Sequence, residues 1–307
     1  MRRRTFVASC FASRIPGAAL ADAGPAGLRF RSSAGGEFQF DTGVLRGTLR
    51  AGGKSQGLTS VVHVPSGRTI SESRGLCSHY RLFSANRRYG RDGAWSVPSE
   101  ASLTADGSVE AHWPAEEERP FEMWVAYRWS GPATLDVDTR VRPQTDLAGF
   151  ESFLASYFAE TFTASTIYVK NPSPTFLAAE ESNGRWQIFP RSKGAVGLIG
   201  DGRWKYPLYP VDWTIMPELA QPLGVRRDSE SGITALMMAP ASDCFAVSTP
   251  CQTDKTHHSL YLSLFGRDIK AGEVARARAR LVIGTSIGER EAVSLSKAYL
   301  DFAHRKR

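Results

Sequence analysis

The feature of this sequence that most constrains its fold is a two-residue alternation of side-chain character. Residues 134–142 and 274–283 show it most clearly, with Leu, Val, Thr or Ala at every second position and Asp or Arg between them. Successive side chains of a β-strand point to opposite faces of its sheet. Both segments are therefore predicted to be strands with one buried and one solvated face. The solvated face of the last strand is expected to carry Arg276, Arg278 and Arg280.

Strand-like segments recur along the whole chain, separated by turn signals such as Asp106-Gly107 and Gly131-Pro132. Residues 150–162 fit either a strand or an unusually apolar helix, and we favour the strand. No alternation of strands with helices is visible. The pattern therefore predicts an all-β fold, a large antiparallel β-sandwich. Further strands are expected within residues 44–49, 58–64, 76–83, 95–104, 108–113, 121–129, 233–239, 244–248 and 259–265.

One convincing helix closes the chain. Ser286 and Glu289 form a capping-box pattern ahead of an apolar stripe at helical spacing. We expect this amphipathic helix within residues 285–307, a single β-domain over residues 37–284, and a flexible, small and polar tether over residues 22–36. With 307 residues, 42% of them hydrophobic, the chain can bury one large core. The stripe comprises Ala292, Leu295, Tyr299 and Phe302.

Residues 1–21 have the composition of a signal peptide. A basic start precedes a modestly apolar middle and Ala19-Leu20-Ala21, where cleavage is expected. Arg3-Arg4 before Thr5-Phe6 resembles the twin-arginine export signal. We therefore expect an exported protein, periplasmic or extracellular. No later segment approaches the roughly 20 apolar residues that a membrane-spanning helix needs, so no membrane span is predicted.

The net charge of +7 comes largely from residues 1–21, which hold four arginines and no acidic residue. Without them the formal charge is +3, which is too small to indicate a nucleic-acid partner, and no DNA- or RNA-binding motif is present. Three cysteines remain after cleavage, an odd number. We expect Cys77, Cys244 and Cys251 to be buried free thiols.

Residues 185–222 concentrate the features of a sugar-binding cleft. They hold three of the seven tryptophans, with arginines and aspartates among them. Aromatic rings cover the apolar C–H faces of a pyranose, and planar charged groups bind its hydroxyls. Five prolines and four glycines favour a long shaped loop. The alternative is a structural loop whose tryptophans fill the edge of a core.

The order of these segments resembles that of the galactose mutarotase-like supersandwich family. The resemblance covers residues 37–284 and rests on a Gly-rich strand and turn (43–57), the strand GLCSHYRLF (75–83), long central strands and a closing hairpin (264–282). It implies a fold that houses aldose epimerases and the β-domains of many glycoside hydrolases and polysaccharide lyases. Family epimerases place a carboxylate base and histidine acids over the anomeric carbon. Their Asn-His motif is absent, and His79-Tyr80-Arg81 is the nearest segment.

Three residues are predicted to carry acid–base chemistry. Alternation in residues 76–83 puts His79 and Arg81 on one face, where the imidazole can donate a proton and the guanidinium can hold a carboxylate or a hydroxyl pair. Glu151 stands among aromatic residues, and apolar surroundings raise the pKa of a carboxyl group toward the range of a general acid or base. The alternatives are a hydrogen-bonded structural histidine and a glutamate paired with an arginine.

The other predicted site residues would bind the substrate. His257-His258 and Cys251 lack the second spaced pair of a zinc site, so no metal is predicted, and no cofactor. The predicted substrate-binding residues are Arg191, Asp201, Arg203, Trp204, Asp212, Trp213 and His257.

The sequence thus predicts an exported, carbohydrate-active protein. It would bind a saccharide in a cleft lined by Trp, Arg and Asp and act on it by acid–base chemistry of the epimerase, hydrolase or lyase type. The alternatives are a non-catalytic carbohydrate-binding protein and a structural protein of the cell envelope. Catalysis requires His79 within reach of a carboxylate in one cleft, whereas binding alone requires only the rings.

Overall fold

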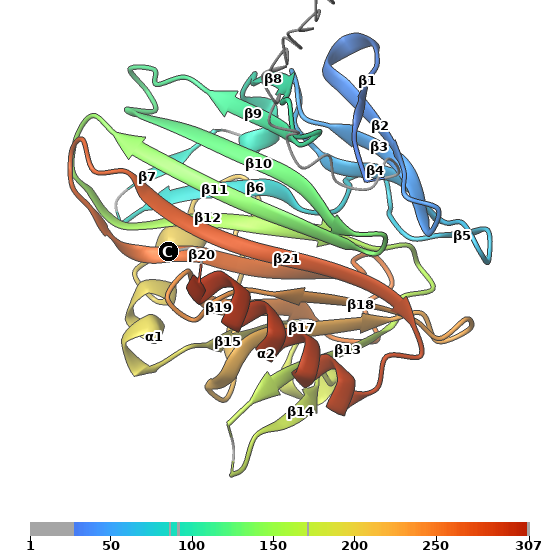
Figure 1. Cartoon of the computed structure of the whole chain (residues 1–307). Coiled ribbons are helices and arrows are strands. Elements are labelled where there is room, and N and C mark those ends of the chain that lie inside the picture. Colours follow the sequence, from blue (N-terminus) through green and yellow to red (C-terminus); the bar gives the residue numbers. More distant parts are fainter. Residues whose placement is uncertain (1–27, 86, 91–92, 171, 306–307) are drawn as a thin grey trace, which may run out of the picture.

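The computed structural model describes residues 28–85, 87–90, 93–170 and 172–305 (Figure 1). The signal peptide expected over residues 1–21 lies outside them. The described residues form three β-sheets, two α-helices and four short 3₁₀ turns. The turns are η1 (Ala34–Gly36), η2 (Ala94–Ser96), η3 (Glu181–Asn183) and η4 (Arg203–Lys205).

The largest sheet has nine strands, all paired antiparallel. Both segments with the clearest alternation lie next to each other in it, as β11 and β21. Its order is β14 (Thr175–Ala178), β13 (Ala164–Val169), β17 (Leu219–Arg227), β18 (Ile233–Met238), β21 (Ala275–Thr285), β11 (Thr134–Pro143), β10 (Phe121–Gly131), β9 (Val109–Trp113) and β8 (Glu100–Leu103).

The second sheet has seven strands, antiparallel except for the pair of β15 and β16. The ambiguous residues 150–162 supply most of its strand β12, which confirms the strand prediction there. Its order is β16 (Thr214–Ile215), β15 (Trp186–Pro190), β19 (Cys244–Pro250), β20 (Ser259–Ile269), β12 (Leu147–Tyr157), β6 (Ser78–Ser84) and β7 (Arg87–Tyr89).

The third sheet has five strands and stands at one end of the molecule (Figure 1). Its first strand falls within residues 22–36, where a flexible tether was expected. Phe30 beside it is buried, whereas most of the described residues of that segment are exposed. The order is β1 (Arg31–Ser32), β2 (Glu37–Asp41), β3 (Leu45–Arg50), β4 (Gly57–His63) and β5 (Arg68–Thr69).

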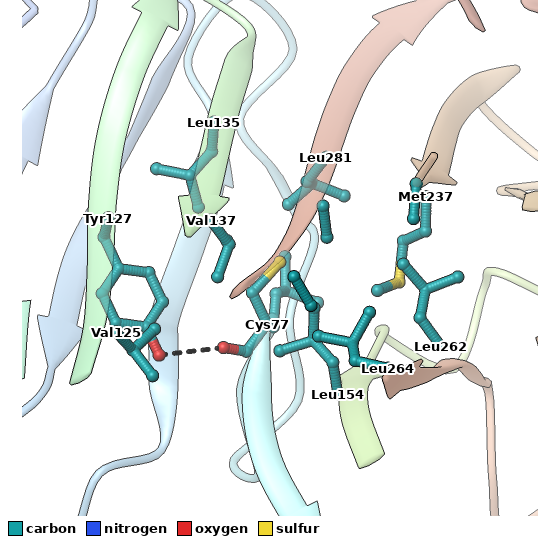
Figure 2. Packing of buried hydrophobic residues seen from close by; sticks show 14 of the residues in the cluster. Cys77, Val125, Tyr127, Leu135, Val137, Leu154, Met237, Leu262, Leu264 and Leu281 are labelled. Atoms are coloured by element: carbon teal, nitrogen blue, oxygen red, sulfur yellow. Dashed lines mark hydrogen bonds between the residues drawn. The ribbon is translucent and has the colours of Figure 1, made fainter. Parts of the chain in front are cut away.

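The main core fills the space between the nine-stranded and seven-stranded sheets. Figure 2 shows Val137 and Leu281 of the first sheet facing Leu154 and Leu262 of the second. Cys77 lies between them, and its carbonyl oxygen accepts a 3.1 Å hydrogen bond from the Tyr127 hydroxyl. The fold is therefore a sandwich, as the alternating strands predict. All three predicted thiols are buried and free, which confirms that prediction.

Helix α2 (Glu289–Arg305) lies across the outer face of the nine-stranded sheet, over β17, β18 and β21 (Figure 1). Its apolar stripe packs against Val225, Met238 and Val282. The arginines of β21 are ion-paired here: Arg276 contacts Asp138, and Arg280 contacts Asp136. No helix among the described residues is long and apolar enough to cross a membrane.

Residues 185–222 are only partly the long loop that the sequence predicts. The segment starts with β15, continues into helix α1 (Lys193–Ile199), and ends in β16 and the beginning of β17. Its irregular part, residues 200–213, crosses the outer face of the seven-stranded sheet and contains η4. This shorter loop is what shapes the candidate site.

Candidate functional site

The outer face of the seven-stranded sheet carries an open cleft of about 590 Å³. Alternation along β12 separates the two faces of the sheet, because Leu154 packs in the sandwich core whereas Phe153 and Tyr157 line the cleft. Strands β6, β12, β15 and β20 contribute to the lining, together with the loop 200–213. The lining residues are Arg74, Tyr80, Arg81, Trp95, Phe153, Tyr157, Arg185, Trp186, Trp204, Tyr209, Pro210, Val211, Trp213, His257 and Tyr261.

Nine of these residues are aromatic, and eight of the rings pack against one another. Phe153 stacks on Tyr261 with ring centroids 4.7 Å apart. The edge of Trp204 meets Phe153 at 4.7 Å, and Trp213 meets Trp204 at 5.1 Å. Edge-to-face and stacked pairs at these distances are the favoured aromatic geometries. The rings therefore form a rigid apolar surface on which a flat ligand can lie.

A β-bulge in β6 adds one more ring to this surface. Phe153 pairs with Arg81, but the next residue of β12, Leu154, pairs with His79, so Tyr80 is an extra residue on β6. A bulge of this kind places two neighbouring side chains on one face of the sheet. Tyr80 and Arg81 consequently both line the cleft, where Tyr80 stacks on Trp95 at 4.4 Å.

Arg81 is almost completely buried at the cleft, between two rings. Its guanidinium carbon lies 4.9 Å from the ring centre of Tyr80 and 5.1 Å from that of Trp204. Its Nη2 donates a 2.6 Å hydrogen bond to the carbonyl oxygen of Tyr209. Its Nε and Nη1 have no hydrogen-bond partner among the described residues. Arg81, which the sequence predicts as a catalytic residue, thus lies in the cleft lining.

His257 and two further arginines line the cleft as well. Arg74 is ion-paired with Glu72, and Arg185 with Asp254. Nη1 of Arg74 lies 3.2 Å from Nε2 of His257. Because an arginine can only donate, Nε2 is the acceptor and the imidazole proton sits on Nδ1. Burial and the neighbouring Arg74 charge lower the pKa of His257, so its neutral form is favoured.

The cleft also contains phenol groups that stay protonated. Burial raises the pKa of Tyr157 and of Tyr261 above the usual range. The Ser259 hydroxyl donates a 2.6 Å hydrogen bond to the oxygen of Tyr261. Both phenols therefore stay protonated near neutral pH and do not act as bases.

Glu151, Asp201 and Arg203, all predicted site residues, come together in a closed ion cluster. Arg203 is fully buried and donates to Oε2 of Glu151 at 3.0 Å and to both oxygens of Asp201 at 2.8–3.1 Å. Burial raises the pKa of Glu151 more than the Arg203 charge lowers it. Glu151 and Arg203 do not line the cleft. The cluster instead ties the loop 200–213 to β12.

His79 lies on the opposite face of the sheet, inside the sandwich. Nδ1 is 2.6 Å from the Ser152 hydroxyl and Nε2 is 3.2 Å from the Thr139 hydroxyl, so the ring connects the two sheets. Burial lowers the pKa of His79 to about 3. Simple alternation predicted that His79 and Arg81 share a face. The bulge at Tyr80 places them on opposite faces instead. This placement matches the structural alternative for His79.

The remaining predicted substrate-binding residues divide between the cleft and the surface. Trp204 and Trp213 line the cleft. Arg191 is bound to the carbonyl oxygen of Ala241, and the exposed Asp212 is ion-paired with Lys205, both outside the lining.

Sequence reasoning missed several lining residues that come from other parts of the chain. Tyr157 could have been found, because it lies four residues after Phe153 in β12 and therefore on the same face of the strand. Trp95 and Tyr261 gave no signal, since only the folded sheet brings β20 and the η2 turn to this face.

The fold is shared with solved structures at low sequence identity. The Slr1438 protein from Synechocystis sp. PCC 6803 aligns with a TM-score of 0.51 and 11% identity, over 80% of this chain and 94% of that chain. A galactose mutarotase related enzyme from Lactobacillus acidophilus aligns with a TM-score of 0.47 and 10% identity, over 81% and 98%. An alpha-N-acetylgalactosaminidase, NagBb from Bifidobacterium bifidum, aligns with a TM-score of 0.49 and 11% identity, over 90% of this chain and 39% of that chain.

No protein-family model matches the sequence, and no curated protein matches it. The sheet order and helix α2 confirm the predicted large antiparallel β-sandwich with a C-terminal helix, and the likeness to the Slr1438 protein shows that the fold is shared. At these identities the likeness shows the fold alone, because one fold supports many activities.

Proposed function

We propose that this protein binds a saccharide in the aromatic cleft. The observation that carries the proposal is the composition of the lining, nine aromatic residues together with three arginines. Aromatic faces cover the apolar C–H faces of a pyranose, while guanidinium and phenol groups donate to its oxygens. The volume of about 590 Å³ lies within the usual range of small-molecule sites, roughly 300–1,000 Å³.

Recognition suits this cleft better than turnover by the predicted acid–base pair. Proton transfer to a bound sugar requires a donor or acceptor within hydrogen-bond reach, and hydrolysis requires two carboxyl groups across the bond. His79 faces the sandwich core, and Glu151 is held by Arg203 away from the lining. None of the described residues lining the cleft is an Asp or a Glu. The cleft therefore favours binding without that pair.

A glycan array followed by titration calorimetry tests the proposal. Trp213→Ala removes a half-buried wall ring and should weaken binding of the best glycan about tenfold, the equivalent of about 1.4 kcal/mol. Trp124→Ala is the matched control. Trp124 stacks on His112 outside the cleft, so its loss should leave affinity unchanged. Equal losses in both variants, or no glycan bound by the wild type, would contradict the proposal.

We also propose that the protein acts outside the cytoplasm. Arg3-Arg4 and the Ala19-Leu20-Ala21 site support this, as does the absence of disulfides among the described residues, which suits a route that exports folded proteins. Mass spectrometry of the exported fraction should find a mature chain that starts at Asp22. Replacing both arginines by lysine should retain the protein in the cytoplasm, whereas Arg14→Lys should not.

A further inference from the structure

Arg81 is a buried cation without a counter-charge. Its side chain is 2% exposed and forms no ion pair with a carboxylate of the described residues. Its contacts are the Tyr209 carbonyl oxygen at 2.6 Å and the Tyr80 hydroxyl at 3.5 Å, both from Nη2. Two of its three nitrogens, Nε and Nη1, donate to no described residue. A buried donor or charge left in this state is costly.

Two other buried arginines show how this fold satisfies such a group when its role is structural. All three nitrogens of Arg226 donate, among others to the carbonyl oxygens of Phe162 and Ser259. Arg203 has two carboxylate partners, Glu151 and Asp201. Structural packing therefore accounts for Arg226 and Arg203 but leaves two nitrogens of Arg81 unexplained.

The surroundings of Arg81 offer its charge two aromatic ring faces but no carboxylate. Two aromatic rings flank the guanidinium, which keeps the local dielectric low and strengthens its field. The other arginines of the lining, Arg74 and Arg185, have their own carboxylates just outside the cleft. Because no described lining residue is acidic, the uncompensated positive charge of the cleft is concentrated at Arg81.

We propose that the saccharide is acidic and that its carboxylate or sulfate group binds the guanidinium of Arg81. The inference rests on the proposed saccharide binding and names the class of sugar that the same cleft accepts. Both groups present paired oxygens that match the fork of a guanidinium. A neutral sugar would leave the buried charge uncompensated, so the cleft discriminates against it.

The experiment compares acidic glycans with their charge-free forms. The wild-type protein is applied to an array of uronate-containing, sulfated and neutral oligosaccharides, whose separate arms distinguish the carboxylate from the sulfate. The best acidic glycan is then titrated beside its carboxyl-reduced or desulfated form. We expect at least about thirtyfold weaker binding of the charge-free form, the lower end of the loss when one partner of a buried charge pair is removed.

Two variants assign the effect to Arg81. Arg81→Gln should lose the same thirtyfold for the acidic glycan while binding its charge-free form as the wild type does. Arg267→Gln, at an exposed arginine that is ion-paired with Glu273 outside the cleft, should leave both affinities unchanged. Near-UV circular dichroism of Arg81→Gln checks its packing, and the comparison of the two glycans on the wild type needs no variant at all.

The outcomes separate this inference from the proposed function. Neutral glycans bound as tightly as acidic ones would overturn the inference and leave saccharide binding intact. Retained preference for the acidic glycan in Arg81→Gln would overturn the role of Arg81. An array on which nothing binds would overturn both proposals.

Discussion

Arg203 and Arg81 are both buried on the cleft side of the same sheet, yet their environments are opposite. Arg203 has two carboxylate partners and fixes the loop 200–213 to β12. Arg81 donates to one backbone carbonyl oxygen and lies between two rings, and two of its nitrogens have no hydrogen-bond partner among the described residues. The contrast teaches that burial of a charge does not by itself reveal a role. A structural arginine finds its hydrogen-bond and ion-pair partners within the fold, whereas a ligand-binding arginine lacks some of them until the ligand binds.

The first prediction, with the largest expected effect on stability, concerns Arg203, the arginine whose partners the fold supplies. Arg203→Met removes the cation between Glu151 and Asp201 and leaves Glu151 buried without its charged partner. Removing one member of a buried ion pair costs about 3–5 kcal/mol, so we expect a loss of about 4 kcal/mol in the free energy of unfolding. Urea denaturation followed by tryptophan fluorescence measures it. A loss below about 1 kcal/mol would show that the cluster is not structural.

The second prediction concerns His79, a buried ring whose two nitrogens both have hydrogen-bond partners. Its pKa is about 3 in the fold and about 6.5 in the unfolded chain, so protonation favours unfolding. Its contribution to stability is complete above pH 6.5 and is lost as the pH falls toward 3. Between pH 7 and pH 5 it should account for about 2 kcal/mol of the decrease in the free energy of unfolding.

His79→Gln tests that window. The variant has no titrating ring, so its free energy of unfolding should fall by about 2 kcal/mol less than that of the wild type over the same interval. Parallel pH dependences of the two proteins would mean that His79 is accessible to protons in the folded state.

The third prediction concerns Arg81, two of whose nitrogens have no hydrogen-bond partner among the described residues. Arg81→Met replaces an uncompensated charge by an apolar side chain of similar length, which should stabilise the protein by about 1 kcal/mol. Denaturation under the conditions used for Arg203→Met provides the comparison. A loss comparable to that of Arg203→Met would place both arginines in the same structural class.

The smallest effect is expected for Glu151→Gln. The amide oxygen still accepts from Nη1 of Arg203, and burial already disfavours the charged carboxylate. The free energy of unfolding should change by less than about 1 kcal/mol. Glu151→Ala is the control, because it leaves Nη1 without its partner and should cost more. If both variants lose the same amount, the carboxylate charge itself holds the cluster together.

Most of the fold was predictable because it depends on local patterns. Alternation identified β11 and β21, and the capping-box pattern and apolar stripe identified α2. The short strand β1 within residues 22–36 was not predicted, since its pairing with β2 depends on contacts that composition does not encode.

The site was predictable only in part, for a geometric reason. Trp204, Trp213, His257 and Arg81 do line the cleft. His79 does not line the cleft, because one extra residue in β6 reverses the face that a strict period of two assigns to it. Clusters such as that of Arg203 cannot be told from ligand-binding groups before the partners of each charge are known.

That extra residue in β6 also has a consequence for how such a cleft can be altered. Without Tyr80, β6 would alternate regularly, with His79 inside and Arg81 outside. A single inserted codon is therefore enough to add an aromatic ring beside a guanidinium while the rest of the strand keeps its partners. Specificity on such a scaffold can be acquired in one genetic step, without rebuilding the sandwich beneath it.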